Sequence, residues 1–235
     1  MIVADRKDIN EILDMIKGCK KVLIAGCRGC VTVCNVGGAK EVGILASTIK
    51  IARKKDGLPI EVDEVTLERQ CDPEYLEVIK DTVGQYDAVV SMACSVGPQF
   101  LSEAYPNQRF FPALNTTFFG GAVEHGIWEE RCAGCGNCII HYFDGMCPIA
   151  RCSKSLLNGP CGGAKDGKCE VDRTRDCGWQ LIYDRLKDIG HLDKMDKYAE
   201  PKNNSRWSRP RSLSIGEGEA TFRSLSGDHK VSSKN

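Results

Sequence analysis

The sequence lacks an excess of positive or negative charge, and it lacks any long apolar run. Its 235 residues carry 32 Lys and Arg against 32 Asp and Glu, so the formal net charge is zero. This balance gives no reason to expect binding to nucleic acid or to an anionic membrane. No stretch of 18 apolar residues occurs, which excludes a membrane-spanning helix. The first residues turn polar at Asp5 and hold no apolar run suited to export, so we expect a cytoplasmic protein.

Motifs for nucleotide binding and hydrolysis are also missing. No G-x-G-x-x-G follows a predicted strand, and there is no Walker P-loop. Nothing resembles a set of nucleophile, histidine and carboxylate. The chain is too short to hold a TIM barrel beside its cysteine-rich segment. By itself, the chain is therefore not expected to transform a substrate.

Strands and helices alternate over the first half of the chain. Apolar runs predict strands at 21–26, 59–65, 86–92 and 109–113. Apolar periodicity predicts helices at 8–18, 37–54, 73–83 and 98–104. This alternation is typical of a parallel sheet with right-handed crossovers. We therefore expect residues 1–122 to form a small Rossmann-like α/β domain.

The second half has a different character. Residues 123–200 are rich in cysteine and glycine, and we expect a ferredoxin-like iron–sulfur module that folds around its metals and closes with a helix at 179–186. Residues 201–235 form a polar tail with seven Lys and Arg against three Asp and Glu. Such a tail is disordered alone, or is an extended basic arm that orders on a partner with Trp207 as its anchor. Phe222 is the other unusual aromatic residue of the tail.

Cysteine is abundant, with 14 residues in the chain. Disulfides are rare in a reducing cytosol, where cysteine-rich spacing indicates metal binding instead. A secreted module held by disulfides is the alternative, but this chain is 42% hydrophobic and has enough ordinary core to need no such cross-links.

The first group of cysteines follows the predicted strands. Cys27, Cys30 and Cys34 come after the first strand, Cys71 after the second and Cys94 after the third. In a parallel sheet these loops share the carboxyl edge, where open α/β folds bind their ligands. We expect a [4Fe-4S] cluster there, with zinc as the second choice, since both accept four thiolates. The alternative is small buried cysteines that fill tight turns.

The second group holds eight cysteines, which suffice for two cubes. They are Cys132, Cys135, Cys138, Cys147, Cys152, Cys161, Cys169 and Cys177. The first three are spaced by two residues and Cys147-Pro148 follows, as in the run typical of bacterial ferredoxins.

The simplest partition gives the first four of these cysteines to one cube and the last four to another. An exchange of Cys147 and Cys152 stays open, because in two-cluster ferredoxins the Cys-Pro cysteine ligates the other cluster. Zinc bound by Cys161, Cys169 and Cys177 stays open as well.

Several blocks of sequence together carry a family resemblance. They are GCRGCVTVCNVGG, ERQCD, SMACSVGPQ, FPALNTTF, ERCAGCGNC, CPIARCSKSLLNGPCGG, GKCEVD and CGWQLIYDRL. They resemble the small subunit of bacterial methylenetetrahydrofolate reductase, a family also called the methylenetetrahydrofolate reductase C-terminal domain. The resemblance runs from Met1 to about Trp207, and LLNGPCGG is its most specific part.

The resemblance implies an iron–sulfur electron-transfer subunit. Its partner is a separate TIM-barrel subunit that binds FAD and reduces 5,10-methylenetetrahydrofolate to 5-methyltetrahydrofolate. The implied cofactors are two or three [4Fe-4S] clusters, with zinc open at one site, and a ferredoxin or a larger electron-transfer complex is a further partner. All thirteen cysteines of the two groups stand at motif positions of the family. A metal-stabilised docking subunit with no redox role is the main alternative, and a free ferredoxin-like carrier is a weaker one.

Overall fold

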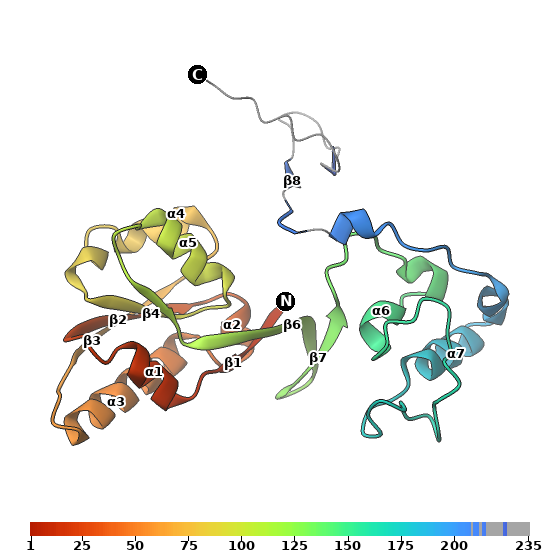
Figure 1. The fold of residues 1–235 in the computed structure, drawn as a ribbon, viewed down its shortest axis with the longest axis horizontal. Coiled ribbons are helices and arrows are strands. Elements are labelled where there is room, and N and C mark those ends of the chain that lie inside the picture. Colours follow the sequence, from red (N-terminus) through yellow and green to blue (C-terminus); the bar gives the residue numbers. More distant parts are fainter. Residues whose placement is uncertain (208, 212, 215–222, 225–235) are drawn as a thin grey trace. The chain divides into compact units, whose positions relative to one another are not determined.

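The structure is a computed structural model that describes residues 1–207, 209–211, 213–214 and 223–224. The chain divides into two compact units, Met1–Glu130 and Arg131–Asn235, drawn in red to light green and in green to blue (Figure 1). A parallel sheet and a separate antiparallel sheet, joined by helices, confirm the predicted α/β class. The division predicted at residues 122 and 200 stays a prediction.

The first unit is built on a parallel sheet of four strands in the order β3-β2-β4-β5. The strands are β2 (Lys21–Cys27), β3 (Glu61–Leu67), β4 (Ala88–Met92) and β5 (Phe110–Pro112). They match the four predicted strands to within two residues at each end. The prediction succeeded because central parallel strands are covered on both faces and are therefore nearly continuous apolar runs.

Helices cover both faces of this sheet. They are α1 (Ile9–Met15), α2 (Cys30–Val33), α3 (Ala39–Lys55), α4 (Pro73–Leu76) and α5 (Val96–Ala104), with 3-10 turns η1 (Glu77–Ile79) and η2 (Val83–Gln85). One face packs Val22 and Ile24 of β2 against the apolar stripes of α1 and α3. The other face packs Leu23 and Ala25 against the segment from α4 to η2 and against α5.

The helix predicted at 73–83 is wrong in length. Asp72 caps α4 by accepting a hydrogen bond from the backbone N–H of Glu74 at 3.4 Å, but the helix ends at Leu76. Two 3-10 turns follow, and the hydroxyl of Thr82 donates to the carbonyl of Ile79 within them. Such local bonds compete with the helical ladder. The apolar residues of the segment still reach the core, because 3-10 turns keep them on one face.

A second, antiparallel sheet was not predicted. It has the order β1-β6-β7 and consists of β1 (Ile2–Arg6), β6 (Leu114–Glu124) and β7 (Ile127–Cys132). β1 pairs with β6, so that Val3 lies opposite Phe118. Most residues of β6 are exposed or half-buried, which leaves no clear apolar alternation to detect. The pairing of β1 depends on a strand more than a hundred residues away, and local sequence does not encode it.

The second unit has short elements. They are η3 (Ile140–Phe143), α6 (Pro148–Arg151), α7 (Gly178–Asp188), η4 (Leu192–Asp196), η5 (Asn204–Trp207), β8 (Leu213–Ser214) and β9 (Arg223–Ser224). The predicted helix at 179–186 is confirmed as α7. Its buried residues Trp179, Ile182 and Leu186 pack with Ile139 and Phe143 into a small core.

The predicted basic arm falls only partly within the structure. Trp207 is 39% exposed, whereas Phe222 and most of the tail lie outside the described residues. The anchoring role of Trp207 stays a prediction. Across the part of the chain that the structure describes, no helix combines the length and the apolar character needed to cross a membrane.

Candidate metal centre

The cysteine-bearing loops of the first unit leave the same edge of the parallel sheet. In the register of the sheet, Cys27 lies opposite Leu67, and Gly26 lies opposite Met92. Cys71 follows the end of β3 by four residues, and Cys94 follows the end of β4 by two. The ends of the three strands are therefore level, and their loops meet at the carboxyl edge, as the sequence predicted.

The thiols at this edge affect one another's pKa values. Burial raises the pKa of Cys71, and the nearby thiols of Cys27 and Cys30 raise it further. Burial also raises the pKa of Cys94, again with contributions from Cys71 and Cys27. Since such effects fade with distance, Cys27, Cys30, Cys71 and Cys94 form one group, which we call the sheet-edge thiols.

Cys34 is turned away from the sheet-edge thiols toward β1. Its Sγ lies 3.6 Å from the carbonyl oxygen of Ile2, to which the thiol donates. Burial raises the pKa of Cys34, the backbone N–H of Ala4 lowers it, and the thiol of Cys30 raises it further. Of the five cysteines predicted at this edge, the structure thus brings four together and sets Cys34 beside them.

Backbone groups surround the sheet-edge thiols closely. The N–H groups of Val96 and Gly97, in the first turn of α5, counteract the raised pKa of Cys94 by stabilising its thiolate. The loop after α2 approaches the end of β4 so closely that a Cβ atom on Gly37 would lie 2.1 Å from the carbonyl oxygen of Met92. Glycine is therefore required at this position.

Further residues, which the sequence did not single out, tie these loops together. Gln70, directly before Cys71, is fully buried and bonds the end of β2 and the hydroxyl of Ser91. A buried polar residue between charged Arg69 and Cys71 leaves no periodic pattern, so only its unusual place before a cysteine could have drawn attention to it. On the surface, Arg28 and Glu68 form an ion pair of 2.7 Å between the same two loops.

In the second unit, Cys135 has a cationic neighbour. The Nζ of Lys202 lies 2.8 Å from the Sγ of Cys135 and also donates to the carbonyl of Asn137. Burial raises the pKa of Cys135, but the Lys202 ammonium and the backbone groups of Asn137 and Cys135 together outweigh it, so the pKa is lowered. The thiolate is the form that binds metal, so Lys202 favours the ligand form of Cys135.

Other thiols of the second unit receive hydrogen bonds from the backbone. The pKa of Cys169 is lowered by the N–H of Val171 and then by the hydroxyl of Ser153. Gly134 donates its N–H to Cys132 at 3.3 Å, and Gly163 donates to Cys161 at 3.4 Å. Hydrogen bonds to sulfur are among the features that set the potential of a protein-bound cluster. Like the other cysteines, Cys138, Cys147, Cys152 and Cys177 are free thiols, and of these four only Cys177 is buried.

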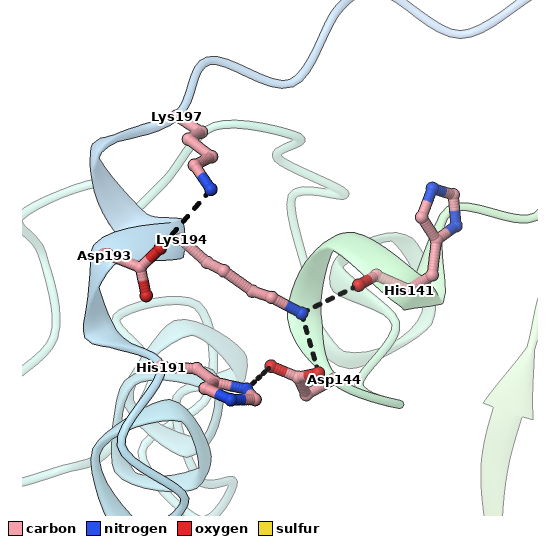
Figure 2. A network of polar contacts seen from close by, with 6 residues as sticks. All are labelled: His141, Asp144, His191, Asp193, Lys194 and Lys197. Atoms are coloured by element: carbon pink, nitrogen blue, oxygen red, sulfur yellow. Dashed lines mark hydrogen bonds and ion pairs between the residues drawn. The ribbon is translucent and has the colours of Figure 1, made fainter.

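A polar network joins the segments around α7 (Figure 2). Asp144 accepts from Lys194 at 2.7 Å and lies 3.0 Å from His191, while Lys194 also donates to the carbonyl of His141 at 3.2 Å. Lys194 and then His191 lower the pKa of Asp144. The imidazole of His191 is thus engaged with a carboxylate, and that network is structural.

In residues 1–207 and the described parts of the tail, no three His, Cys, Asp or Glu side chains are placed to hold a single metal ion. Zinc requires four ligands within about 2.3 Å of one centre. A cube instead binds each thiolate through a different iron, so its sulfurs stand further apart. The sheet-edge thiols match a cube in number and in donor type.

Part of the chain matches a known protein family. Residues 111–205 match a family described as methylene-tetrahydrofolate reductase C terminal. Through this segment, the chain is related to methylenetetrahydrofolate reductase. The match contains all eight cysteines of the second group and Lys202, and it begins after the sheet-edge thiols. No curated protein and no solved structure matches the chain.

Proposed function

We propose that the chain is the iron–sulfur electron-transfer subunit of a methylenetetrahydrofolate reductase complex. It passes electrons to or from the FAD of a separate TIM-barrel subunit, where 5,10-methylenetetrahydrofolate is reduced to 5-methyltetrahydrofolate. The match over residues 111–205 supports the link to this enzyme. Reduced thiols are needed for the role, which places the chain in the cytoplasm.

One observation carries the redox part of the proposal. Three loops that are far apart in sequence bring Cys27, Cys30, Cys71 and Cys94 to one edge of the sheet, within electrostatic influence of one another. Four thiols whose loops leave one edge of the sheet suit a [4Fe-4S] cluster in number and in donor type. Such a cluster, when bound, accepts and donates one electron at a time.

The residues around the sheet-edge thiols would tune that cluster. The N–H groups of Val96 and Gly97 lower the pKa of Cys94, and donors near a ligand sulfur stabilise the more negative, reduced state. In the second unit, Lys202 plays the same electrostatic part beside Cys135. The eight cysteines of the second group would hold one or two further clusters, with zinc as the alternative at one site.

A metal-stabilised docking subunit is the second candidate. The observation in its favour is the scarcity of regular structure between Arg131 and Cys177, where α6 has four residues and η3 has four. Metal binding would supply much of the folding free energy of such a segment. In that case the partner subunit would perform all of the redox chemistry.

Anaerobic metal analysis of the full chain, alone and co-purified with its flavin subunit, tests the proposal. We expect iron and acid-labile sulfide and a visible absorption shoulder that dithionite bleaches. A colourless chain with stoichiometric zinc would contradict it. Rapid mixing of the complex with reductant then separates the two candidates, because an electron-transfer subunit reduces its clusters on the timescale of flavin reduction and a docking subunit does not.

A further inference from the structure

Gln70 and Ser91 form a fully buried polar pair under the sheet-edge thiols. The Nε2 of Gln70 donates to the carbonyl of Ala25 at 2.7 Å and to that of Gly26 at 2.9 Å. The hydroxyl of Ser91 donates to the Oε1 of Gln70 at 2.6 Å. One carboxamide therefore uses both of its polar ends, and no part of it faces solvent.

The partners of Gln70 lie immediately before the ligand-bearing loops. Gly26 directly precedes Cys27, and Gln70 itself directly precedes Cys71. Ser91 lies opposite Ala25 in the register and stands three residues before Cys94. A single side chain thus links the ends of β2, β3 and β4, the three strands from which the sheet-edge thiols emerge.

Gln70 also supports the first turn of α5. A Cβ atom on Gly97 would lie 2.8 Å from the Cβ of Gln70, so the two backbones are in close contact. The N–H of Gly97 donates to the carbonyl of Cys94 at 2.8 Å and lowers the pKa of the Cys94 thiol. Moving Gln70 would therefore disturb the hydrogen bonds of Cys94 as well as the position of Cys71.

The chemistry of burial indicates why a glutamine stands here. An apolar residue would fill the same volume without the cost of desolvating an amide. A buried amide stabilises a fold only when it is bonded at both ends, and it then fixes one arrangement of its neighbours. The network around Gln70 specifies the spacing of the three loops, which apolar packing alone leaves free to shift.

We infer that Gln70 is the positioning residue that sets the spacing of the sheet-edge thiols. The role of those thiols as cluster ligands rests on the proposed function, but their spacing can be measured without any metal. Gln70→Met removes the polar ends and keeps the length of the side chain. Gln108→Met is the matched control, because Gln108 also donates to a carbonyl, that of Tyr86 at 2.9 Å, in a loop that precedes β4.

The test is disulfide formation in the full chain after iron and zinc have been removed by a chelator. Trypsin cleaves after Arg28 and Lys80, so Cys27, Cys71 and Cys94 fall on separate peptides. In the unmodified chain, diamide, which oxidises two thiols to one disulfide, should rapidly link these peptides in pairs. In Gln70→Met the rate should fall about tenfold, the smaller of the effects usual for residues that orient metal ligands. In Gln108→Met the rate of disulfide formation should stay within about twofold of that in the unmodified chain.

Equal rates in Gln70→Met and the unmodified chain would overturn the inference. Ser91→Ala guards against a variant that does not fold, because it removes one hydroxyl and leaves the rest of the network. It should slow the same links by a smaller factor, and an unchanged rate in a folded Ser91→Ala protein would also count against the inference. Disulfides within the second unit serve as an internal control and should form equally fast in every variant.

Iron analysis keeps this inference separate from the proposed function. If the unmodified chain holds no iron but Gln70→Met slows the links, the positioning role stands and the cluster proposal fails. If iron is present and Gln70→Met forms the links at the normal rate, the cluster proposal stands and the positioning role fails. Where the cluster proposal and the positioning role both stand, Gln70→Met should also release iron to a chelator about tenfold faster than Gln108→Met.

Discussion

The Nζ of Lys202 lies 2.8 Å from the Sγ of Cys135, although the two residues are 67 positions apart. This contact ties the segment after α7 back to the first cysteines of the second unit. It also places a positive charge beside a thiol that the sequence predicts to be a metal ligand. Both residues lie within the segment that matches the reductase family.

Replacement of Lys202 by methionine should make Cys135 less reactive. Removal of the ammonium raises the pKa of Cys135, which Lys202 now holds down, so less thiolate is present at neutral pH. In the chelator-treated chain, alkylation of Cys135 by iodoacetamide at pH 7 should slow about threefold or more. The difference should vanish at a pH above the pKa of Cys135 in both proteins. Lys197→Met is the control, because Lys197 pairs with Asp193 at 3.3 Å, and it should leave the rate unchanged.

Replacement of Asp144 by asparagine should remove an acid-sensitive contribution to stability. The folded pKa of Asp144 is lowered by Lys194 and His191, so its contribution is present above the unfolded pKa of about 3.9. It is lost as the pH falls through the lowered pKa. Asparagine is the suitable replacement, because Asp144 adopts a left-handed backbone conformation with φ of 44°.

Thermal unfolding at several pH values checks this prediction. The Tm of Asp144→Asn should be lower than that of the unmodified chain at pH 7, and the two should converge toward pH 3. Asp193→Asn breaks only an exposed pair between residues four apart on η4, and it should change Tm little at any pH. Equal Tm values for Asp144→Asn and the unmodified chain at pH 7 would show that the network of Figure 2 adds nothing to stability.

Replacement of Gly37 by alanine should destabilise the first unit. The new Cβ would lie 2.1 Å from the carbonyl oxygen of Met92, so the loop after α2 must move away from the end of β4. Urea unfolding should show a loss of about 1–3 kcal/mol, the usual cost of overpacking. Gly84→Ala is the matched control, because nothing lies within 4 Å of a Cβ at Gly84. A loss confined to Gly84→Ala would refute the account of the sheet edge.

Removal of bound metal should affect the two units unequally. The first unit has extensive cores on both faces of its sheet, whereas the second has one small core around Trp179. Hydrogen exchange before and after anaerobic chelation should therefore show a larger loss of protection between Arg131 and Asp188 than in β2 or α3. Equal protection in both states would mean that metal contributes nothing to the folding of the second unit.

Prediction from sequence succeeded where the signal was local. The strands β2 and β4 are apolar runs, β3 mixes apolar with acidic residues, and all three lead into cysteine-bearing loops. The helices α3 and α7 show clear helical periodicity. The shared edge of the loops after β2, β3 and β4 followed from the topology of parallel sheets. Prediction from sequence failed for the antiparallel sheet, because its strands pair across long stretches of the chain. It also failed for the segment after α4, where local side-chain hydrogen bonds overrode the helical pattern.

The sequence by itself determined that thiols would gather at the carboxyl edge of a parallel sheet, because apolar strands and alternating helices allow only one hand of connection. Only the tertiary structure decided which thiols form the group. Cys34 donates to Ile2 on a strand whose partner lies more than a hundred residues away, and Gln70 joins three strand ends that meet only after folding. Both depend on long-range contacts, and those contacts leave no periodic trace in the chain.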